Sequence, residues 1–167
     1  MKSEVCVSRS ASAEEREQAY ERVYQSVATI LEGEADWVAA MATTVCELHT
    51  AFAYFDWTGF YRHMEPELLV IGPYQGGHGC LRIPFARGVC GASAREQRTV
   101  LVPNVHEFPG HIACASSTEN EIVVPVIAPT GKLLAVLDVD SDDPAAFSAI
   151  DQQGLERICG LLGRQYG

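Results

Sequence analysis

The chain has 167 residues, the size of one ordinary domain, and this is enough to bury a hydrophobic core without cross-links. Its formal net charge is −10, and its 12 lysine and arginine residues are scattered singly, which argues against a nucleic-acid partner or an anionic membrane surface. No apolar run approaches the roughly 20 residues of a membrane span. Residues 1–16 lack the apolar centre of a signal peptide, so we expect a cytoplasmic protein whose thiols stay reduced.

A helix is predicted directly after a flexible N-terminal arm. Residues 1–11 show no periodic apolar pattern, so we assign them to the arm and residues 12–167 to a single domain. Ser12 and Glu15 have the spacing of a capping box, in which each side chain satisfies a free amide of the other residue. Apolar residues then recur at helical spacing as far as Leu31, which predicts the first helix.

A second helix and several strands are predicted next. Apolar side chains at helical spacing favour a helix over 37–48, and from Ala51 the composition becomes typical of strands. Strands are predicted over 51–63, 68–74, 80–84 and 99–103, and a short helix over 88–97.

The clearest local signal lies near the C-terminus. EIVVPVIA and KLLAVLDVDS are joined by Thr130 and Gly131, which predicts two buried strands connected by a hairpin turn. Residues 104–120 are mostly loop, and Ser148 is placed to cap a terminal helix.

Helices at both ends of about six strands predict an α+β domain. We expect the N- and C-terminal helices to pack on one face of a central antiparallel sheet. Loops would cover the other face and enclose a small-molecule pocket. Pairing of the terminal helices across a two-fold axis makes a homodimer a further expectation.

Three of the six cysteines lie beside small residues in the region of strands and turns. They are Cys80 in GGHGC, Cys90 in RGVCG and Cys114 in GHIACAS. Their spacings are too long for a CxxC redox motif or a structural zinc site, so folding must bring them together. A nucleophile with at least one partner thiol is the minimum that a thiol-dependent reductase requires.

Cys114 is the best candidate nucleophile from the residues themselves. It lies in the loop before ENEIVVP between Ala113 and Ala115, where a substrate has access and backbone amides of a turn can lower the pKa of the thiol. The three other cysteines are interpreted as structural or incidental. Cys46 and Cys159 are predicted to be buried on apolar helix faces, and Cys6 to be exposed.

The order of these motifs resembles that of the free methionine-R-sulfoxide reductases, which have a GAF-type fold. The resemblance covers residues 38–162 and rests on DWTGFYRH, GPYQGGHGC with LRIP, RGVCG, GHIAC with ENEIVVP, and AVLDVDS. It implies a single GAF-like domain that reduces free L-methionine-R-sulfoxide to L-methionine. It also implies no prosthetic cofactor, with thioredoxin as the external thiol reductant.

The same resemblance implies roles for the three cysteines. Attack of Cys114 on the sulfoxide sulfur would yield methionine and a cysteine sulfenic acid, which a second thiol converts to an intramolecular disulfide. Cys80 would be the resolving thiol and Cys90 a third thiol that assists or substitutes for it. The residues alone do not rank Cys80 above Cys90.

Three acidic residues are candidates for substrate binding. Glu121 comes seven residues after Cys114, at the entrance to a buried strand. Asp138 and Asp140 are two residues apart in a predicted strand, so their side chains point to the same face of that strand. A carboxylate cluster would select a free amino acid by its ammonium group, and one carboxyl with a raised pKa would donate the proton. The alternative is that Asp138 and Asp140 only end a strand in a solvated turn.

Trp57 and Tyr61 also share one face of a strand and would form an aromatic wall for the sulfoxide. That contact is implied by the resemblance, and the alternative is a purely structural role in the core. His78, His106 and His111 lack the short spacing of zinc motifs, so we expect no metal site.

A second functional class stays open from the sequence. A GAF-type module that binds a small molecule or senses redox state would use the same cysteines without turnover. The length leaves no room for an output domain, and the acidic set suits an ammonium group better than the phosphate of a cyclic nucleotide. Both points favour the reductase.

Overall fold

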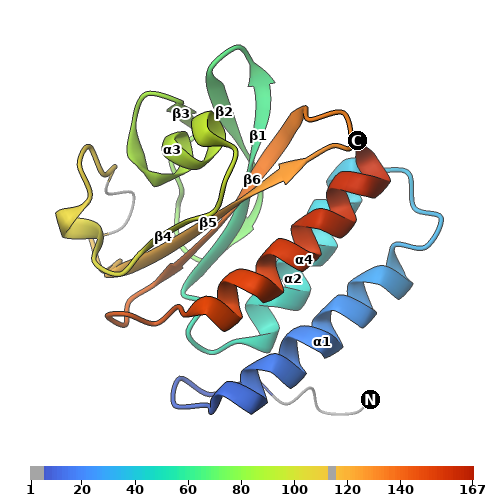
Figure 1. Cartoon of the computed structure of the whole chain (residues 1–167), viewed down its shortest axis with the longest axis vertical. Coiled ribbons are helices and arrows are strands. Elements are labelled where there is room, and N and C mark those ends of the chain that lie inside the picture. Colours follow the sequence, from blue (N-terminus) through green and yellow to red (C-terminus); the bar gives the residue numbers. More distant parts are fainter. Residues whose placement is uncertain (1–5, 113–115) are drawn as a thin grey trace.

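The structure is a computed structural model that describes residues 6–112 and 116–167. The described residues form one six-stranded sheet, with the long helices on one side and the short helix 88–96 on the other (Figure 1). The elements are α1 (Ala13–Ile30), α2 (Trp37–Ala51), β1 (Trp57–Glu65), β2 (Leu68–Gln75), β3 (Arg82–Pro84), α3 (Gly88–Glu96), β4 (Val100–Val102), the 3-10 turn η1 (Val105–Glu107), β5 (Asn120–Ile127), β6 (Leu133–Ser141) and α4 (Ala149–Tyr166).

The sheet is antiparallel throughout, with strand order β3-β2-β1-β6-β5-β4. The central strands β1 and β6 are therefore paired on both sides, and the β5–β6 hairpin that was predicted from the sequence is present. This architecture confirms the α+β prediction. No helix in the described ranges has the length and apolar character to cross a membrane.

The larger hydrophobic core fills the helical side of the sheet. α4 packs on β5, α2 packs on β1 and β2, and α1 lies across α2 and α4 (Figure 1). Phe60, Val124 and Leu137 point from the sheet into this core and are fully buried or nearly so. Burial of each such side chain contributes roughly 1.5–3 kcal/mol, so this face supplies most of the apolar stabilisation.

A smaller core lies on the opposite face, beneath α3. Trp57, Tyr61, Val89, Cys90 and Val123 are among its buried members. Two neighbouring buried carboxyl groups, Glu121 and Asp138, interrupt this face, whereas the buried carboxylate of Asp151 on the helical side is hydrogen-bonded to tyrosine hydroxyls and Arg16. The second face is therefore the one that carries chemistry.

The predicted strand starting at Ala51 is wrong over its first residues. α2 continues through Ala51, and β1 begins only at Trp57. Phe52, Tyr54 and Phe55 pack against one another instead of alternating across a sheet, with ring centroids of Phe52 and Phe55 4.8 Å apart. Aromatic residues are common both in strands and in the hydrophobic core, and here packing in the core sets the conformation of this segment.

The described part of the N-terminal arm contacts the domain at two places. Val7 is 5% exposed. Its amide donates to the carbonyl of Ala51, and its carbonyl accepts from the amide of Ala53. Arg9 forms ion pairs with Asp56 and Asp143.

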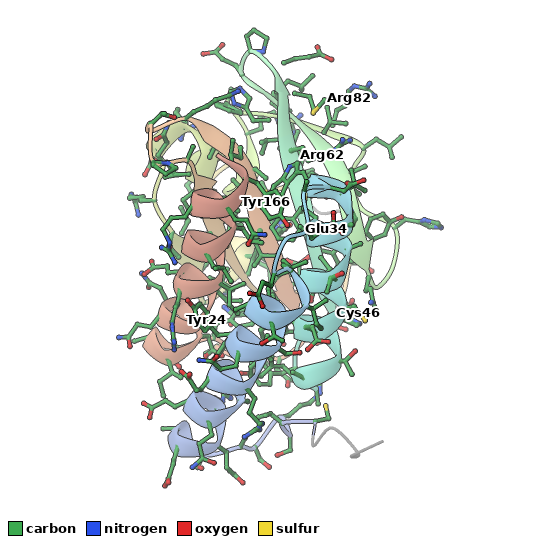
Figure 2. The ribbon with its side chains drawn as sticks, turned by 90° about the vertical axis from the view of Figure 1, so that its right-hand side faces the viewer. Tyr24, Glu34, Cys46, Arg62, Arg82 and Tyr166 are labelled. Atoms are coloured by element: carbon green, nitrogen blue, oxygen red, sulfur yellow. The ribbon has the colours of Figure 1, made fainter. Side chains whose placement is uncertain are left out.

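The prediction of a buried Cys46 is also wrong, because its side chain is exposed on the outer side of α2 (Figure 2). Met41, Val45 and Leu48 form the buried face of that helix. A residue one position from Val45 is rotated by about 100° around the helix axis, which takes Cys46 away from the sheet. Cys159 is buried and Cys6 is exposed, as expected.

Asp151 connects the two terminal helices to the segment before β1. It is the N3 residue of the capping box that starts α4, and its carboxylate accepts from the backbone amide of Ser148 at 2.8 Å. The same buried carboxylate accepts from the hydroxyls of Tyr54 at 2.6 Å and Tyr20 at 3.0 Å, and pairs with Arg16 at 3.2 Å. The hydroxyl of Ser148 also donates to it at 2.9 Å, so one side chain satisfies five donor groups.

Replacing Asp151 by Ala is expected to lower the free energy of unfolding by about 3–5 kcal/mol, because Arg16 and both tyrosine hydroxyls lose their acceptor. Urea unfolding measures this loss. Glu14→Ala, on the exposed side of α1, is the matched control and should change stability by less than about 0.5 kcal/mol. A loss for Asp151→Ala as small as that of the control would contradict a structural role for this network.

Candidate active site

The strand register places acidic and aromatic side chains in one row across the sheet. Asp140 on β6 lies between Trp57 on β1 and Glu121 on β5. In the next row on the same face, Asp138 pairs with Gly59. Alternation along the strands therefore directs all three carboxyl groups away from the helical core.

These side chains line a pocket between the sheet, α3 and two loops. The 76–81 loop covers it from the β2–β3 side, and the 103–119 loop covers it from the β4–β5 side, as far as the latter is described. The lining residues are Trp57, Tyr61, His78, Gly79, Ile83, Gly88, Val89, Cys90, His111, Ile112, Thr118, Glu121, Asp138 and Asp140. All five substrate-binding candidates from the sequence are brought together here.

The carboxyl groups are buried close to one another. Glu121 and Asp138 are each 6% exposed, and Oδ1 of Asp138 has no hydrogen-bond partner among the described residues. Burial, and then repulsion from a neighbouring carboxylate, raises the pKa of Glu121, of Asp138 and of Asp140. The empty pocket therefore retains protons to a higher pH than an exposed acidic cluster would.

Little positive charge is available in the pocket to balance these groups. Nε2 of His111 lies 3.4 Å from Oε2 of Glu121, but desolvation lowers the pKa of His111 and disfavours its charged form. No lysine or arginine is among the described lining residues. The site is consequently suited to a ligand that brings its own cation.

Aromatic rings lie beside the carboxyl groups on the same face of the sheet. The ring of Trp57 stacks on Tyr61 and on Tyr74, with centroids 5.8 and 5.4 Å apart, and its Nε1 donates to the carbonyl of Gly77 at 3.0 Å. A Cβ atom at Gly59 would come within 2.4 Å of the Trp57 ring. Gly59 was not among the predicted site residues, although a glycine inside an aromatic strand is a signal of close approach.

Cys90 enters the pocket from the first turn of α3. Gly88 starts that helix with φ +69°, a left-handed conformation that favours glycine, and its amide donates to the carbonyl of Gly110 in the neighbouring loop at 3.1 Å. The thiol of Cys90 is free and buried; burial and the nearby carboxylates of Asp138 and Glu121 raise its pKa. Cys90 is thus a weak nucleophile in this state.

The two other candidate cysteines differ in what the structure describes. Cys80 is partly buried, packs against the smaller core and follows Gly79, which lines the pocket. Cys114 lies outside the described residues. In the described part of its loop, Ile112 and Thr118 both line the pocket.

The three histidines are not equivalent. His78 and His111 line the pocket, whereas His106 is largely exposed and lies 3.3 Å from Glu119. Thr118, Val89 and Ile83 also line it, and no pattern in the sequence distinguished them from ordinary core or loop residues.

Asp138→Asn is expected to stabilise the ligand-free protein, with a larger gain at pH 8 than at pH 5. The pKa of Asp138 in the folded protein is raised above its unfolded value of about 4. Above pH 4 the folded state therefore binds a proton that the unfolded state has lost. The stability of the wild type consequently falls as the pH rises toward the folded-state pKa. Asparagine does not titrate and escapes this loss. Urea unfolding at both pH values, with a chelator present, measures the difference.

Asp143→Asn is the control, because Asp143 is 44% exposed at its side chain and pairs with Arg9 outside the pocket. It should show no gain that grows with pH. A gain for Asp138→Asn that shrinks between pH 5 and pH 8 would contradict the burial of a protonated carboxyl group.

The GAF domain family model matches residues 15–166 of this chain. GAF domain-containing protein A of Dictyostelium discoideum is 40% identical over 147 residues, which are 88% of this chain and 92% of that protein. Free methionine-R-sulfoxide reductase of Saccharomyces cerevisiae is 35% identical over 155 residues, 89% of this chain and 86% of that protein.

A solved structure gives the same assignment. The X-ray structure of free methionine-R-sulfoxide reductase from Neisseria meningitidis, in complex with its substrate, has a TM-score of 0.83 and 38% sequence identity to this chain, covering 89% of this chain and 90% of that one. The chain therefore belongs to the GAF domain family, in the group that includes the free methionine-R-sulfoxide reductases.

Proposed function

We propose that this protein reduces free L-methionine-R-sulfoxide to L-methionine. The observation that carries the proposal is a buried pocket in which three carboxyl groups lie beside aromatic rings and a thiol, without lysine or arginine among the described lining residues. Relatives and a substrate-bound structure that carry this activity in their names support it.

The acidic groups account for recognition of a free amino acid. An ammonium group placed near Glu121, Asp138 or Asp140 would supply the positive charge that the pocket lacks and would favour ionisation of the carboxyl groups it contacts. A methionine sulfoxide inside a protein has no ammonium group, so burying it here would leave the carboxyl groups uncompensated. The pocket thus discriminates by charge as well as by size.

The remaining protons serve the reaction. A carboxyl group that stays protonated donates a hydrogen bond to the sulfoxide oxygen and increases the electrophilic character of the sulfur. The thiolate of Cys114 attacks that sulfur, and the S–O bond breaks as the oxygen takes up two protons and leaves as water. Water then attacks the cysteine sulfur of the resulting S–S sulfonium, which breaks the S–S bond, releases one proton and gives methionine and a sulfenic acid on Cys114. Ile112 lines the pocket and Cys114 is two residues further along the chain, which supports Cys114 as the nucleophile.

A second thiol completes the cycle. The thiol of Cys80 attacks the sulfenic sulfur, water leaves, and a disulfide forms that thioredoxin then reduces in the cytoplasm. One sulfoxide and two thiols thus give one sulfide, one disulfide and one water. Cys90 is the less suitable resolving thiol in the described state, because its buried environment disfavours the thiolate.

Reduced protein mixed with free L-methionine-R-sulfoxide should lose about two thiols for each methionine formed. Cys114→Ser should release no methionine, whereas Cys80→Ser should complete one turnover and then stop, because only the resolving step is removed. Thiol titration together with amino-acid analysis measures both quantities.

Cys46→Ser is the control, because Cys46 is an exposed free thiol on the outer side of α2. It should match the wild type in both quantities. Single-turnover reduction by Cys114→Ser would refute the assignment of the nucleophile, and ligand binding without any thiol loss in the wild type would favour a GAF-type binding or redox-sensing module.

Glu121→Gln should lower kcat/KM for the free amino acid by roughly a hundredfold, because a buried charge partner of the ammonium group is removed. The wild type should discriminate strongly against N-acetyl-methionine-R-sulfoxide, which lacks the ammonium group. Discrimination should be much weaker in Glu121→Gln. Steady-state kinetics with both compounds measures this.

Glu119→Gln is the matched control, because Glu119 is two residues away and its side chain is 42% exposed. Its kinetics should equal those of the wild type. Equal rates of the wild type on the free and the N-acetylated compounds would contradict recognition through the ammonium group.

A further inference from the structure

Three potential metal ligands converge in the pocket from three different elements. They are Sγ of Cys90 on α3, a carboxylate oxygen of Glu121 on β5 and a carboxylate oxygen of Asp138 on β6, and these atoms all lie within 4.8 Å of one another. Each of the three residues is buried, with 3 to 6% of its surface exposed. Regular elements, rather than loops, therefore fix the positions of the donors.

The bonding of Asp138 points independently to a missing cation. Its Oδ1 is buried and accepts no hydrogen bond from any described residue. Buried carboxylate oxygens are almost always satisfied, so an orphaned one inside a pocket marks the place of a ligand. Its neighbours Cys90 and Glu121 hydrogen-bond to the Asp138 carboxyl group and offer a sulfur and a carboxylate oxygen as further potential metal ligands.

We propose that Cys90, Glu121 and Asp138 form a binding site for a zinc ion. A thiolate with two carboxylates matches the borderline-soft character of Zn²⁺, whereas Mg²⁺ and Ca²⁺ prefer oxygen ligands alone. Three protein ligands leave the fourth tetrahedral position to water.

The required movement of the donors is small. Zinc bonds of about 2.0–2.3 Å at tetrahedral angles separate the ligand atoms by roughly 3.3–3.6 Å. Donors that now lie within 4.8 Å must therefore approach by no more than about 1.5 Å, which side-chain rotation supplies. Binding releases the proton of the thiol and any protons held by the two carboxyl groups, and no electron is transferred.

The consequence for function rests on the proposed function. Zinc and the substrate ammonium group would neutralise the same carboxylates, so one excludes the other. The ion would act as a competitive inhibitor and would hold Cys90 as a thiolate that is not available for disulfide chemistry. Availability of zinc would thus regulate the reductase.

Isothermal titration calorimetry of the full chain with zinc chloride, in a non-thiol reductant, tests the site without any assay of activity. We expect one ion per chain, with proton release that depends on the buffer. Cys90→Ser and Asp138→Asn should each weaken binding by roughly a hundredfold, a large effect expected when one of three ligands is lost. Cobalt chloride should give thiolate-to-cobalt charge-transfer absorption that Cys90→Ser abolishes.

Cys114→Ser and Cys46→Ser are the controls, because the other thiols of the chain can also attract zinc. Both should bind zinc as the wild type does. Zinc affinity that depends on Cys114 and is unchanged by Cys90→Ser would overturn the proposal, as would the absence of binding to the wild type. Glu121→Gln provides the same test should Cys90→Ser not fold, as judged by circular dichroism.

A competition titration separates this proposal from the proposed function. Free methionine-R-sulfoxide should weaken zinc binding in the Cys114→Ser variant, where no turnover consumes it. Displacement supports the shared site. If zinc binds through Cys90 and Asp138 but the sulfoxide does not displace it, the metal site stands and the location proposed for the substrate fails.

Discussion

Placement of three carboxyl groups on one face of the central strands, with Glu121 and Asp138 buried, is the constraint on which the rest of the molecule depends. Carboxylates without partners are costly to bury, and Glu121 and Asp138 lie where desolvation raises the pKa of each. The opposite face of the same strands compensates, because Phe60, Val124 and Leu137 are buried there beneath the helices. A sheet with one apolar face can thus carry an electrostatically unfavourable site on the other.

The cost of the site also explains its selectivity. Because burial raises the pKa of these carboxyl groups, a bound cation that favours their ionised form couples ligand binding to charge compensation. The rings of Trp57 and Tyr61 line the pocket beside the carboxyl groups and suit a polarizable sulfur group. Charge and aromatic surface in one pocket select a small molecule that has both a cation and an apolar sulfur end.

Local signals in the sequence predicted the parts of the fold that local physics determines. Ser148 caps α4 as expected, and the two-residue spacing of Asp138 and Asp140 puts them on one face. Features that depend on distant packing were not predictable. The start of β1 was misplaced because Phe52 packs in the helical core, and Cys46 was misplaced because α2 has small apolar residues around most of its circumference.

The convergence of Cys90 with Glu121 and Asp138 illustrates the same limit. Their separation along the chain exceeds every short metal motif, so only the pairing of β5 with β6 and the docking of α3 bring them together. A thiol that is buried among carboxyl groups is a weak nucleophile but a good ligand for a borderline-soft cation, since the cation reverses the electrostatics that oppose the thiolate. The carboxyl groups that suit the pocket to an ammonium group therefore also suit it to zinc. The thiol of Cys90 distinguishes the two cations, because it is a ligand for zinc and not for an ammonium group.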